Sequence, residues 1–326
     1  MMLLLLRMRR FILGGMLGAA LLLVAATDAP ATILYSSATR NTTAPSVENG
    51  LAAWNLEATW GYYMATPIDP THFIAARHIG GTSSTITFQG TTYQVNLASR
   101  VEDVGSDLAI YTLASGTFPA YAPLYDAAVD GSEIGKSFTV IGRGTQRGAA
   151  VYVNSALKGW QWGTADYVQS WGRNVVDGFV DFGPTNDSIL YFDFNSDGIA
   201  NEATLSVGDS SGAIFINVNG LWKLAGINYG VDGPFSLTGS SSDPGFNAAI
   251  FDARGLYYKN EQNVWTLVPR NLHDPVPASS YASRISARLD WILAQAPGAV
   301  VPEPGSLVLL VAAALAFFGR LRRRPR

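Results

Sequence analysis

Three short segments of the chain carry residues that could break an acyl bond, and one of them supplies a nucleophile. Ser210 lies in Val207-Gly-Asp-Ser-Ser-Gly-Ala213, directly before the apolar run Ile214–Ile216. A hydroxyl nucleophile needs a tight turn that exposes its oxygen, and nearby backbone N–H groups that bind the oxyanion formed on attack. The small residues around Ser210 permit both. A Gly-Asp-Ser sequence taken alone is also an ordinary polar turn.

A second segment supplies a general base. His78 follows the apolar run Phe73–Ala76 and precedes a glycine pair. A general base must be held at the edge of the core and still be reachable, and the end of a strand provides this. The other two histidines are His72 and His273. His72 is near His78 in the sequence, but no third ligand has the spacing of a zinc site, so we expect no metal there.

A third segment supplies a carboxylate. Asp107 precedes the apolar run Leu108–Leu113, where it could orient an imidazole and stabilise its charged form. Alone, it would be interpreted as an exposed turn residue. Together, the three candidates follow one another in the order His78, Asp107, Ser210, each at the boundary of a strand or turn. This is the chymotrypsin-type order, so their joint occurrence favours a catalytic triad.

These segments resemble the three signature blocks of trypsin-like serine proteases: Ala75-Ala-Arg-His78, Asp107-Leu-Ala109 and Gly208-Asp-Ser-Ser-Gly212. Two further segments, Leu224–Gly230 and Arg284–Ile292, are similar to the strand that lines the family's substrate cleft and to its closing helix. The resemblance extends over residues 60–293, which is nearly all of the expected folded part.

The resemblance implies an endopeptidase that acts on a protein or peptide substrate and needs no cofactor. Ser210 would attack the peptide carbonyl, His78 would take and return the proton, and Asp107 would fix the imidazole tautomer. The N–H groups of Gly208 and Ser210 would form the oxyanion hole.

The resemblance also implies which residues bind the substrate. Thr204 would lie near the floor of the pocket that receives the side chain before the scissile bond, with Asn228 and Gly230 near its wall. None of these positions carries a carboxylate. We therefore predict cleavage after an uncharged residue of small or medium size.

The chain departs from the family pattern at four places. Arg77 and Ile79 flank the histidine where a small residue and a cysteine are usual, and Ser211 replaces a glycine. No Ile-Val-Gly-Gly sequence is present that cleavage could free to pair with Asp209. Asp209 therefore needs another partner, and activation by such a cleavage is not expected.

Short strands separated by Gly, Pro, Asp and Ser predict an all-β fold of two six-stranded antiparallel β-barrels, followed by a C-terminal α-helix. Asn219-Gly220 predicts a tight hairpin. The helix is predicted in Tyr281–Ala294 from the spacing of its apolar residues. The expected strands of the first barrel are Phe73–Ala76, Thr85–Phe88, Tyr93–Leu97, Leu108–Leu113 and Phe138–Ile141; those of the second are Ala150–Val153, Ile189–Phe194, Ala213–Val218, Leu221–Ile227 and Phe246–Phe251.

The N-terminal part divides into three segments. Residues 1–26 combine arginines, an apolar run and small residues in the order of a secretory signal peptide. Residues 27–50 are rich in Ser, Thr, Asn and Ala and are predicted to be a loosely ordered lead-in. The protease-like domain is expected over 51–296, with the barrel boundary near 125–135. A retained N-terminal membrane anchor is the alternative to the signal peptide.

Residues 297–326 are expected to be a linker and a sorting tail. Val301-Pro-Glu-Pro-Gly305, a short apolar segment at 306–319 and a terminal arginine cluster closely resemble the PEP-CTERM signal of Gram-negative bacteria that produce exopolysaccharide. The resemblance implies recognition and removal by an exosortase and a transient membrane association through the tail. The mature protein would then be exported to the cell surface or extracellular matrix. An ordinary C-terminal anchor is the alternative.

Composition excludes several other functions. The net charge is −3 and the chain has no cysteine, so neither a nucleic-acid partner nor thiolate chemistry is expected. Asp193-Phe-Asn195-Ser-Asp197-Gly198 resembles the start of a calcium loop, but Thr204 stands where position twelve requires glutamate. An Asx-rich turn is the alternative. Two other functions remain open: a noncatalytic protease-like module that binds surface or matrix components, and a β-sandwich adhesin.

Overall fold

The computed structural model describes residues 32–183, 188–260 and 262–302. The predicted signal peptide and the apolar tail segment lie outside these residues. Within the described part of the chain, no helix has the length and apolar character needed to cross a membrane.

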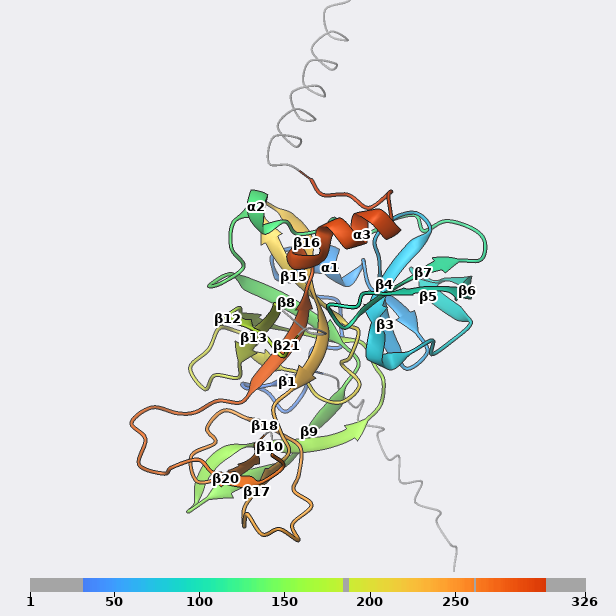
Figure 1. Cartoon of the computed structure of the whole chain (residues 1–326). Helices are drawn as coiled ribbons and strands as arrows, with labels where there is room; N and C mark the ends of the chain where they lie inside the picture. The colour runs from blue at the N-terminus through green and yellow to red at the C-terminus, as the bar shows by residue number, and fades with distance from the viewer. Residues whose placement is uncertain (1–31, 184–187, 261, 303–326) are drawn as a thin grey trace, which may run out of the picture.

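The first half of the chain forms a closed six-stranded barrel, drawn in blue to cyan in Figure 1. Aromatic side chains fill it: Trp60, Phe73 and Tyr111 are completely buried, and the rings of Phe73 and Tyr111 stack 5.4 Å apart. Their large apolar surfaces stabilise the barrel without any disulfide. Around the barrel the strands are β2 (Ala58–Trp60), β3 (Tyr63–Pro67), β4 (His72–Ala76), β7 (Leu108–Leu113), β6 (Thr91–Glu102) and β5 (Thr85–Phe88).

The second half is built on a seven-stranded sheet. The predicted hairpin at Asn219-Gly220 is present, with φ of 53° and 88°, and it joins β15 to β16. Across the sheet the strands are β11 (Ser170–Val175), β8 (Ser137–Gly142), β15 (Ala213–Val218), β16 (Leu221–Val231), β21 (Ser279–Arg284), β13 (Ile189–Asp193) and β12 (Gly178–Val180).

The all-β fold with a barrel in each half and a C-terminal helix is confirmed, but the second barrel differs from the expected closed six-stranded one. The sheet order does not pair β11 with β13. Instead the side chain of Asn174, on β11, donates hydrogen bonds to the carbonyls of Asp193 (2.8 Å) and Ala203 (3.0 Å). A side chain thus links β11 to Asp193, at the end of β13, and to Ala203 of a separate two-stranded sheet.

Two predicted strands of the second barrel belong to a separate lobe at the lower end of Figure 1. The prediction placed Ala150–Val153 and Phe246–Phe251 in the second barrel, but Ala150–Val153 and Ala248–Ile250 pair with β10 instead. It also placed Phe138–Ile141 in the first barrel, whereas this segment pairs with β11 and β15 in the seven-stranded sheet. The local apolar pattern identified strands correctly and could not identify their partners. One sheet of the lobe contains β18 (Ala248–Ile250), β10 (Ala156–Ala165) and β9 (Thr145–Val153), and the other contains β17 (Phe235–Ser236), β19 (Tyr257–Lys259) and β20 (Trp265–Leu267).

The segments before and after the barrels are ordered by packing. Residues 27–50 were expected to be loosely ordered. In the described part of this segment, β1 (Ile33–Leu34) is buried and pairs with β14 (Ala203–Thr204). The C-terminal helix α3 (Leu289–Gln295) is shorter than predicted, because β21 continues to Arg284. The other short helices are η1 (Val47–Asn49), α1 (Leu51–Trp54), η2 (Arg77–Ile79), α2 (Ala127–Asp130) and η3 (Ser286–Arg288).

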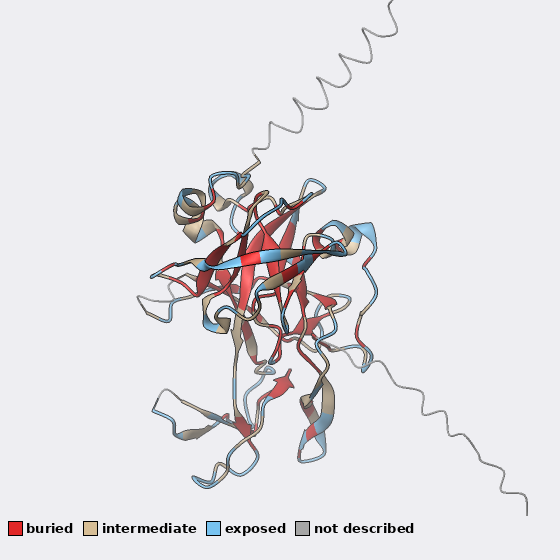
Figure 2. Ribbon diagram, turned by 90° about the vertical axis from the view of Figure 1, so that its right-hand side faces the viewer, coloured by how far each residue is buried: buried red, intermediate tan, exposed pale blue. Residues whose placement is uncertain are grey.

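A shared apolar core joins the two barrels, and Figure 2 shows the buried strands at the centre of the molecule. Ile74 and Leu108 of the first barrel belong to the same buried cluster as Phe215 and Ile227 of the second. This shared core therefore holds the strands of the two halves against each other.

Glu57, just before β2, makes stability depend on pH. Its carboxyl group is buried and accepts one hydrogen bond, from the Thr66 hydroxyl at 2.5 Å. Burial raises its pKa from 4.5 to about 8. The folded protein therefore keeps a proton that the unfolded chain releases, and the free energy of unfolding falls as the pH rises through this interval.

We expect Glu57→Gln to remove a fall on the order of a few kcal/mol between about pH 5 and pH 8. Urea unfolding of wild type and variant at both pH values measures it. The free energy of unfolding of the variant will still fall somewhat with pH, because burial also raises the pKa of Glu202 to about 8. An unchanged slope in Glu57→Gln would contradict the prediction.

Candidate active site

Strand pairing in the first barrel brings His78 and Asp107 together. Strands β4 and β7 are antiparallel, with Ala76 opposite Leu108. The chain leaves β4 at Ala76 and enters η2, while Asp107 directly precedes β7. The N–H of Arg77 donates to the carbonyl of Asp107 at 2.8 Å, which extends the ladder by one bond. The next residue, His78, therefore lies beside the Asp107 side chain.

Asp107 holds the histidine by two hydrogen bonds. The His78 N–H donates to Oδ1 at 2.9 Å, and Nδ1 lies 2.5 Å from Oδ2. The carboxylate is 3% exposed, whereas the imidazole is 39% exposed. An ionised carboxylate only accepts, so the proton between them belongs on Nδ1. The other ring nitrogen, Nε2, is then an acceptor.

Ser210 reaches that acceptor from the other half of the molecule. Its Oγ lies 2.9 Å from His78 Nε2, although the two residues are 132 positions apart in the sequence. Ser210 stands in the turn that precedes β15. The three residues singled out from the sequence thus form one hydrogen-bonded line, from a buried carboxylate to a partly exposed hydroxyl.

Asp209 holds the turn before Ser210 in place. Its carboxylate accepts from the Gly144 N–H at 2.8 Å, the Ser206 N–H at 2.8 Å and the Ser206 hydroxyl at 3.0 Å. A Cβ on Gly144 would lie 2.2 Å from Oδ2, so the approach requires glycine. Burial raises the Asp209 pKa to about 6, against the lowering effect of these bonds and of the Arg40 charge. The partner that Asp209 needs is therefore supplied by the chain itself.

Gly208 and Ser210 leave their backbone N–H groups available. Among the described residues, neither N–H donates to a protein acceptor. Gly208 has φ +94°, which glycine adopts at no steric cost. Both N–H groups belong to the turn that carries the Ser210 hydroxyl, so they could bind an oxyanion.

Ser211, which replaces the usual glycine, ties the nucleophile turn to the first barrel. It adopts φ +67° and is fully buried. Its hydroxyl accepts from the Ala76 N–H at 2.9 Å, and its own N–H donates to the Asn228 carbonyl at 3.0 Å. This side chain thus links the turn of Ser210 to the end of β4, two residues before His78.

Arg77 and Ile79, the other two residues that depart from the family pattern, both make contacts around the histidine turn. Arg77 donates to the Asp103 carbonyl at 3.0 Å and approaches Asp107 Oδ1 within 4.0 Å. Ile79 is partly buried and packs against the shared core and against the core of the first barrel. Each therefore supports the histidine turn.

A cavity of about 170 Å³ opens beside Ser210. Of the three residues expected at the substrate pocket, Asn228 and Gly230 line this cavity and Thr204 does not. Thr204 pairs with Ile33 and its hydroxyl bonds to Ser280 at 2.8 Å, because β14 is covered by β1. Tyr229, which also lines the cavity, belongs to Leu224–Gly230, the segment expected to line the cleft. The lining residues that sequence reasoning missed are Trp162, Leu205, Ser206, Val207 and Val231. Trp162 comes from β10, and no local signal in the sequence pointed to it.

The segment that resembles a calcium loop is engaged by its neighbours. Asp193 accepts from the Ser279 hydroxyl at 2.6 Å, and the Asn195 N–H donates to Glu202 at 3.1 Å. Burial raises the pKa of Glu202 to about 8. Within residues 32–183, 188–260 and 262–302, no three acidic or histidine side chains gather as metal ligands.

Comparisons with known proteins find only distant structural similarity. No protein-family profile matches the chain, and no curated protein matches it. Among solved structures, the active form of the Rv3671c protease from M. tuberculosis aligns with a TM-score of 0.41 and 13% identity, covering 78% of this chain and 87% of that one. An inactive serine-to-alanine mutant of Rv3671c from M. tuberculosis H37Rv gives 0.40 and 12%, covering 79% and 99%.

Proposed function

We propose that the chain is a serine endopeptidase that hydrolyses peptide bonds through an acyl-enzyme intermediate. The observation that carries the proposal is the line of two short contacts, 2.9 Å from Ser210 Oγ to His78 Nε2 and 2.5 Å from His78 Nδ1 to Asp107. In this geometry the imidazole can take the hydroxyl proton during attack and return it to the leaving amine. The buried carboxylate stabilises the imidazolium formed in between.

Two further features support acyl transfer. The N–H groups of Gly208 and Ser210 have no described protein acceptor, and together they would bind the tetrahedral oxyanion. Strand β16 pairs with β15 only as far as Ile227, whereas its pairing with β21 continues to Val231. Asn228 is bonded to Gly212 and Ser211 of the nucleophile turn, and beyond it β15 no longer pairs with β16. A substrate chain would add as a strand along this part of β16.

The cavity beside Ser210 would receive the substrate side chain before the scissile bond. At about 170 Å³ and with no charged residue in its lining, it suits an uncharged side chain of small or medium size. The proposal also includes export and processing of the tail by an exosortase, with the mature enzyme at the cell surface or in the matrix. These parts depend on the sequence signals alone.

A fluorophosphonate probe tests the proposed activity, because it reacts with a serine activated by a neighbouring base. We expect one equivalent to label the purified protein at Ser210, with cleavage of casein or a peptide library. Ser210→Ala and His78→Ala should abolish both. His72→Ala is the control, because His72 is also hydrogen-bonded to an aspartate, at 2.8 Å, but is not part of the hydrogen-bonded series from Asp107 to Ser210. Folded wild-type protein that neither labels nor cleaves would favour the noncatalytic binding module.

A further inference from the structure

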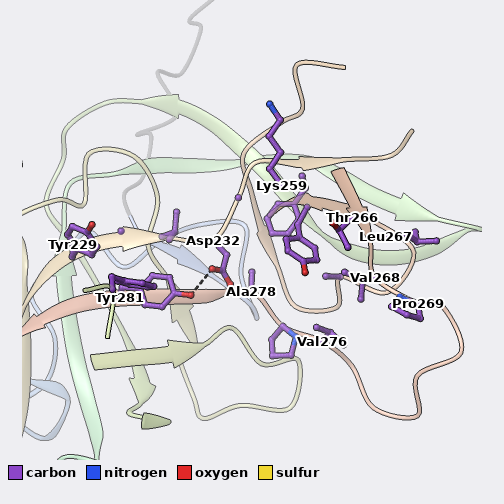
Figure 3. Close-up of a pocket in the computed structure, with 18 of the residues that line it drawn as sticks. Tyr229, Asp232, Lys259, Thr266, Leu267, Val268, Pro269, Val276, Ala278 and Tyr281 are labelled. Carbon is purple, nitrogen blue, oxygen red and sulfur yellow. Dashed lines mark hydrogen bonds between the residues drawn. The ribbon is translucent and has the colours of Figure 1, made fainter. Parts of the chain in front are cut away.

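A second, larger groove of about 1050 Å³ extends from His78 into the lobe. Its walls come from the end of β16, from β21 and from β19 and β20 of the lobe, and Figure 3 shows side chains from these elements around it. Binding pockets for small ligands hold about 300–1,000 Å³, so this groove has room for several residues of a polypeptide.

The groove exposes apolar surface to water. Phe182, Tyr258 and Leu267, which line it, are 49%, 40% and 41% exposed. Val268, Pro269, Val276 and Pro277 continue the apolar wall. A concave apolar surface of this kind favours an apolar occupant, because the occupant removes the surface from water.

Charged side chains in the lining are engaged with the protein. Asp232 accepts from the Ser279 N–H at 2.8 Å and from the Tyr281 hydroxyl at 2.7 Å, the bond drawn in Figure 3. The Lys259 ammonium lies over the Trp265 ring, 4.9 Å from its centre. Asp232 thus forms part of the wall and orients Tyr281, and the Lys259 ammonium is held over Trp265.

The groove is continuous with the proposed catalytic site. Tyr229, Gly230 and Val231 line both the groove and the cavity beside Ser210. No atom lies within 4 Å of the position of a Cβ on Gly230, so the surface is open there. A substrate chain that pairs antiparallel with β16 runs in the opposite direction to it. The residues that precede the one in the cavity then lie beside Gly230 and Val231, towards the lobe.

We infer that the lobe selects substrates, by binding an extended apolar segment several residues long on the N-terminal side of the scissile bond. This inference rests on the proposed function and adds a substrate class to it: proteins with an apolar stretch before the cleavage site. The lobe is a specificity element, and its residues take no part in bond cleavage.

Matched peptides test the inference. Three substrates share one cleavage sequence: the first has four apolar residues added on the N-terminal side, the second has four serines there, and the third has the apolar residues on the C-terminal side. We expect the first to have a kcat/KM about tenfold or more above the second. Equal values for the first two, or a gain confined to the third, would overturn the inference.

Substitutions in the groove wall test whether the lobe causes the gain in kcat/KM. Tyr258→Ser with Leu267→Ser should remove most of the gain from the N-terminal apolar extension, while hydrolysis of a short ester substrate stays at the wild-type rate. Val264→Ser is the control, because Val264 is 57% exposed in the same lobe and does not line the groove. A gain that survives in the double variant would also overturn the inference.

Binding to Ser210→Ala separates the two proposals, because it needs no catalysis. Fluorescence anisotropy of labelled peptides should show tighter binding of the first peptide than of the second. If wild type hydrolyses the short ester and this difference is absent, the groove inference fails and the proposed function stands. If the difference is present and no ester or peptide is hydrolysed, the proposed function fails and the groove remains a peptide-binding site.

Discussion

Asp107→Asn should lower kcat by about 10⁴-fold with little change in the fold. The His78 N–H donates to Oδ1 of residue 107, so the amide of an asparagine must place its oxygen there. Its NH₂ group then faces His78 Nδ1, which becomes an acceptor. The imidazole proton moves to Nε2, and Nε2 can no longer accept the proton of Ser210.

Hydrolysis of a chromogenic peptide measures this loss, with circular dichroism as the check on folding. Asp69→Asn is a matched control. Asp69 holds His72 in the same way, accepting its N–H at 2.7 Å and lying 2.8 Å from its Nδ1, but its histidine does not contact Ser210. We expect this control to keep kcat within about threefold of wild type. Near wild-type activity in Asp107→Asn would refute the assigned tautomer.

Gly208→Ala should lower kcat by about 10²–10³-fold, the loss that follows removal of one oxyanion donor. Gly208 has φ +94°, and a Cβ at this position would lie 2.9 Å from the carbonyl oxygen of Arg143. The backbone must shift to relieve the contact. The shift turns the residue 208 N–H away from the place where the oxyanion forms.

Gly220→Ala separates this effect from simple backbone strain. Gly220 has φ +88° in the hairpin between β15 and β16, and no atom lies within 4 Å of the position that a Cβ would take there. Both substitutions place a Cβ at positive φ and should reduce stability by about 1–2 kcal/mol, but only Gly208→Ala should reduce kcat, with KM for a short substrate nearly unchanged. Equal kcat values for the two variants would exclude Gly208 as an oxyanion donor.

Much of the candidate site could be predicted because its signals are local. His78, Asp107 and Ser210 each stand where an apolar run meets a turn, and a run of this kind forms a strand whatever its partner is. The Asn219-Gly220 hairpin is local in the same sense, since two residues determine it through their backbone conformations. Because His78, Asp107 and Ser210 follow one another in the chymotrypsin-type order, a catalytic triad could be predicted from three separate segments.

The partners of the strands could not be predicted. Ala150–Val153 has the same kind of sequence as a barrel strand, but it pairs in the lobe. Thr204 was expected in the substrate cavity and is covered by β1. The Tyr258 and Leu267 surface of the groove was missed, because nothing nearby in the sequence distinguishes it from other short strands.

By itself, the sequence determined where several strands lie, the chemical groups at their ends and the all-β class. The tertiary structure alone decided that Ser210 lies 2.9 Å from His78, that Ser211 bonds to Ala76 across the two halves, and that a lobe extends the cleft. The physical reason is that strand formation depends on neighbouring residues. Strand pairing depends on the sum of many weak contacts between residues that are far apart in the sequence. A local sequence pattern carries no information about that sum.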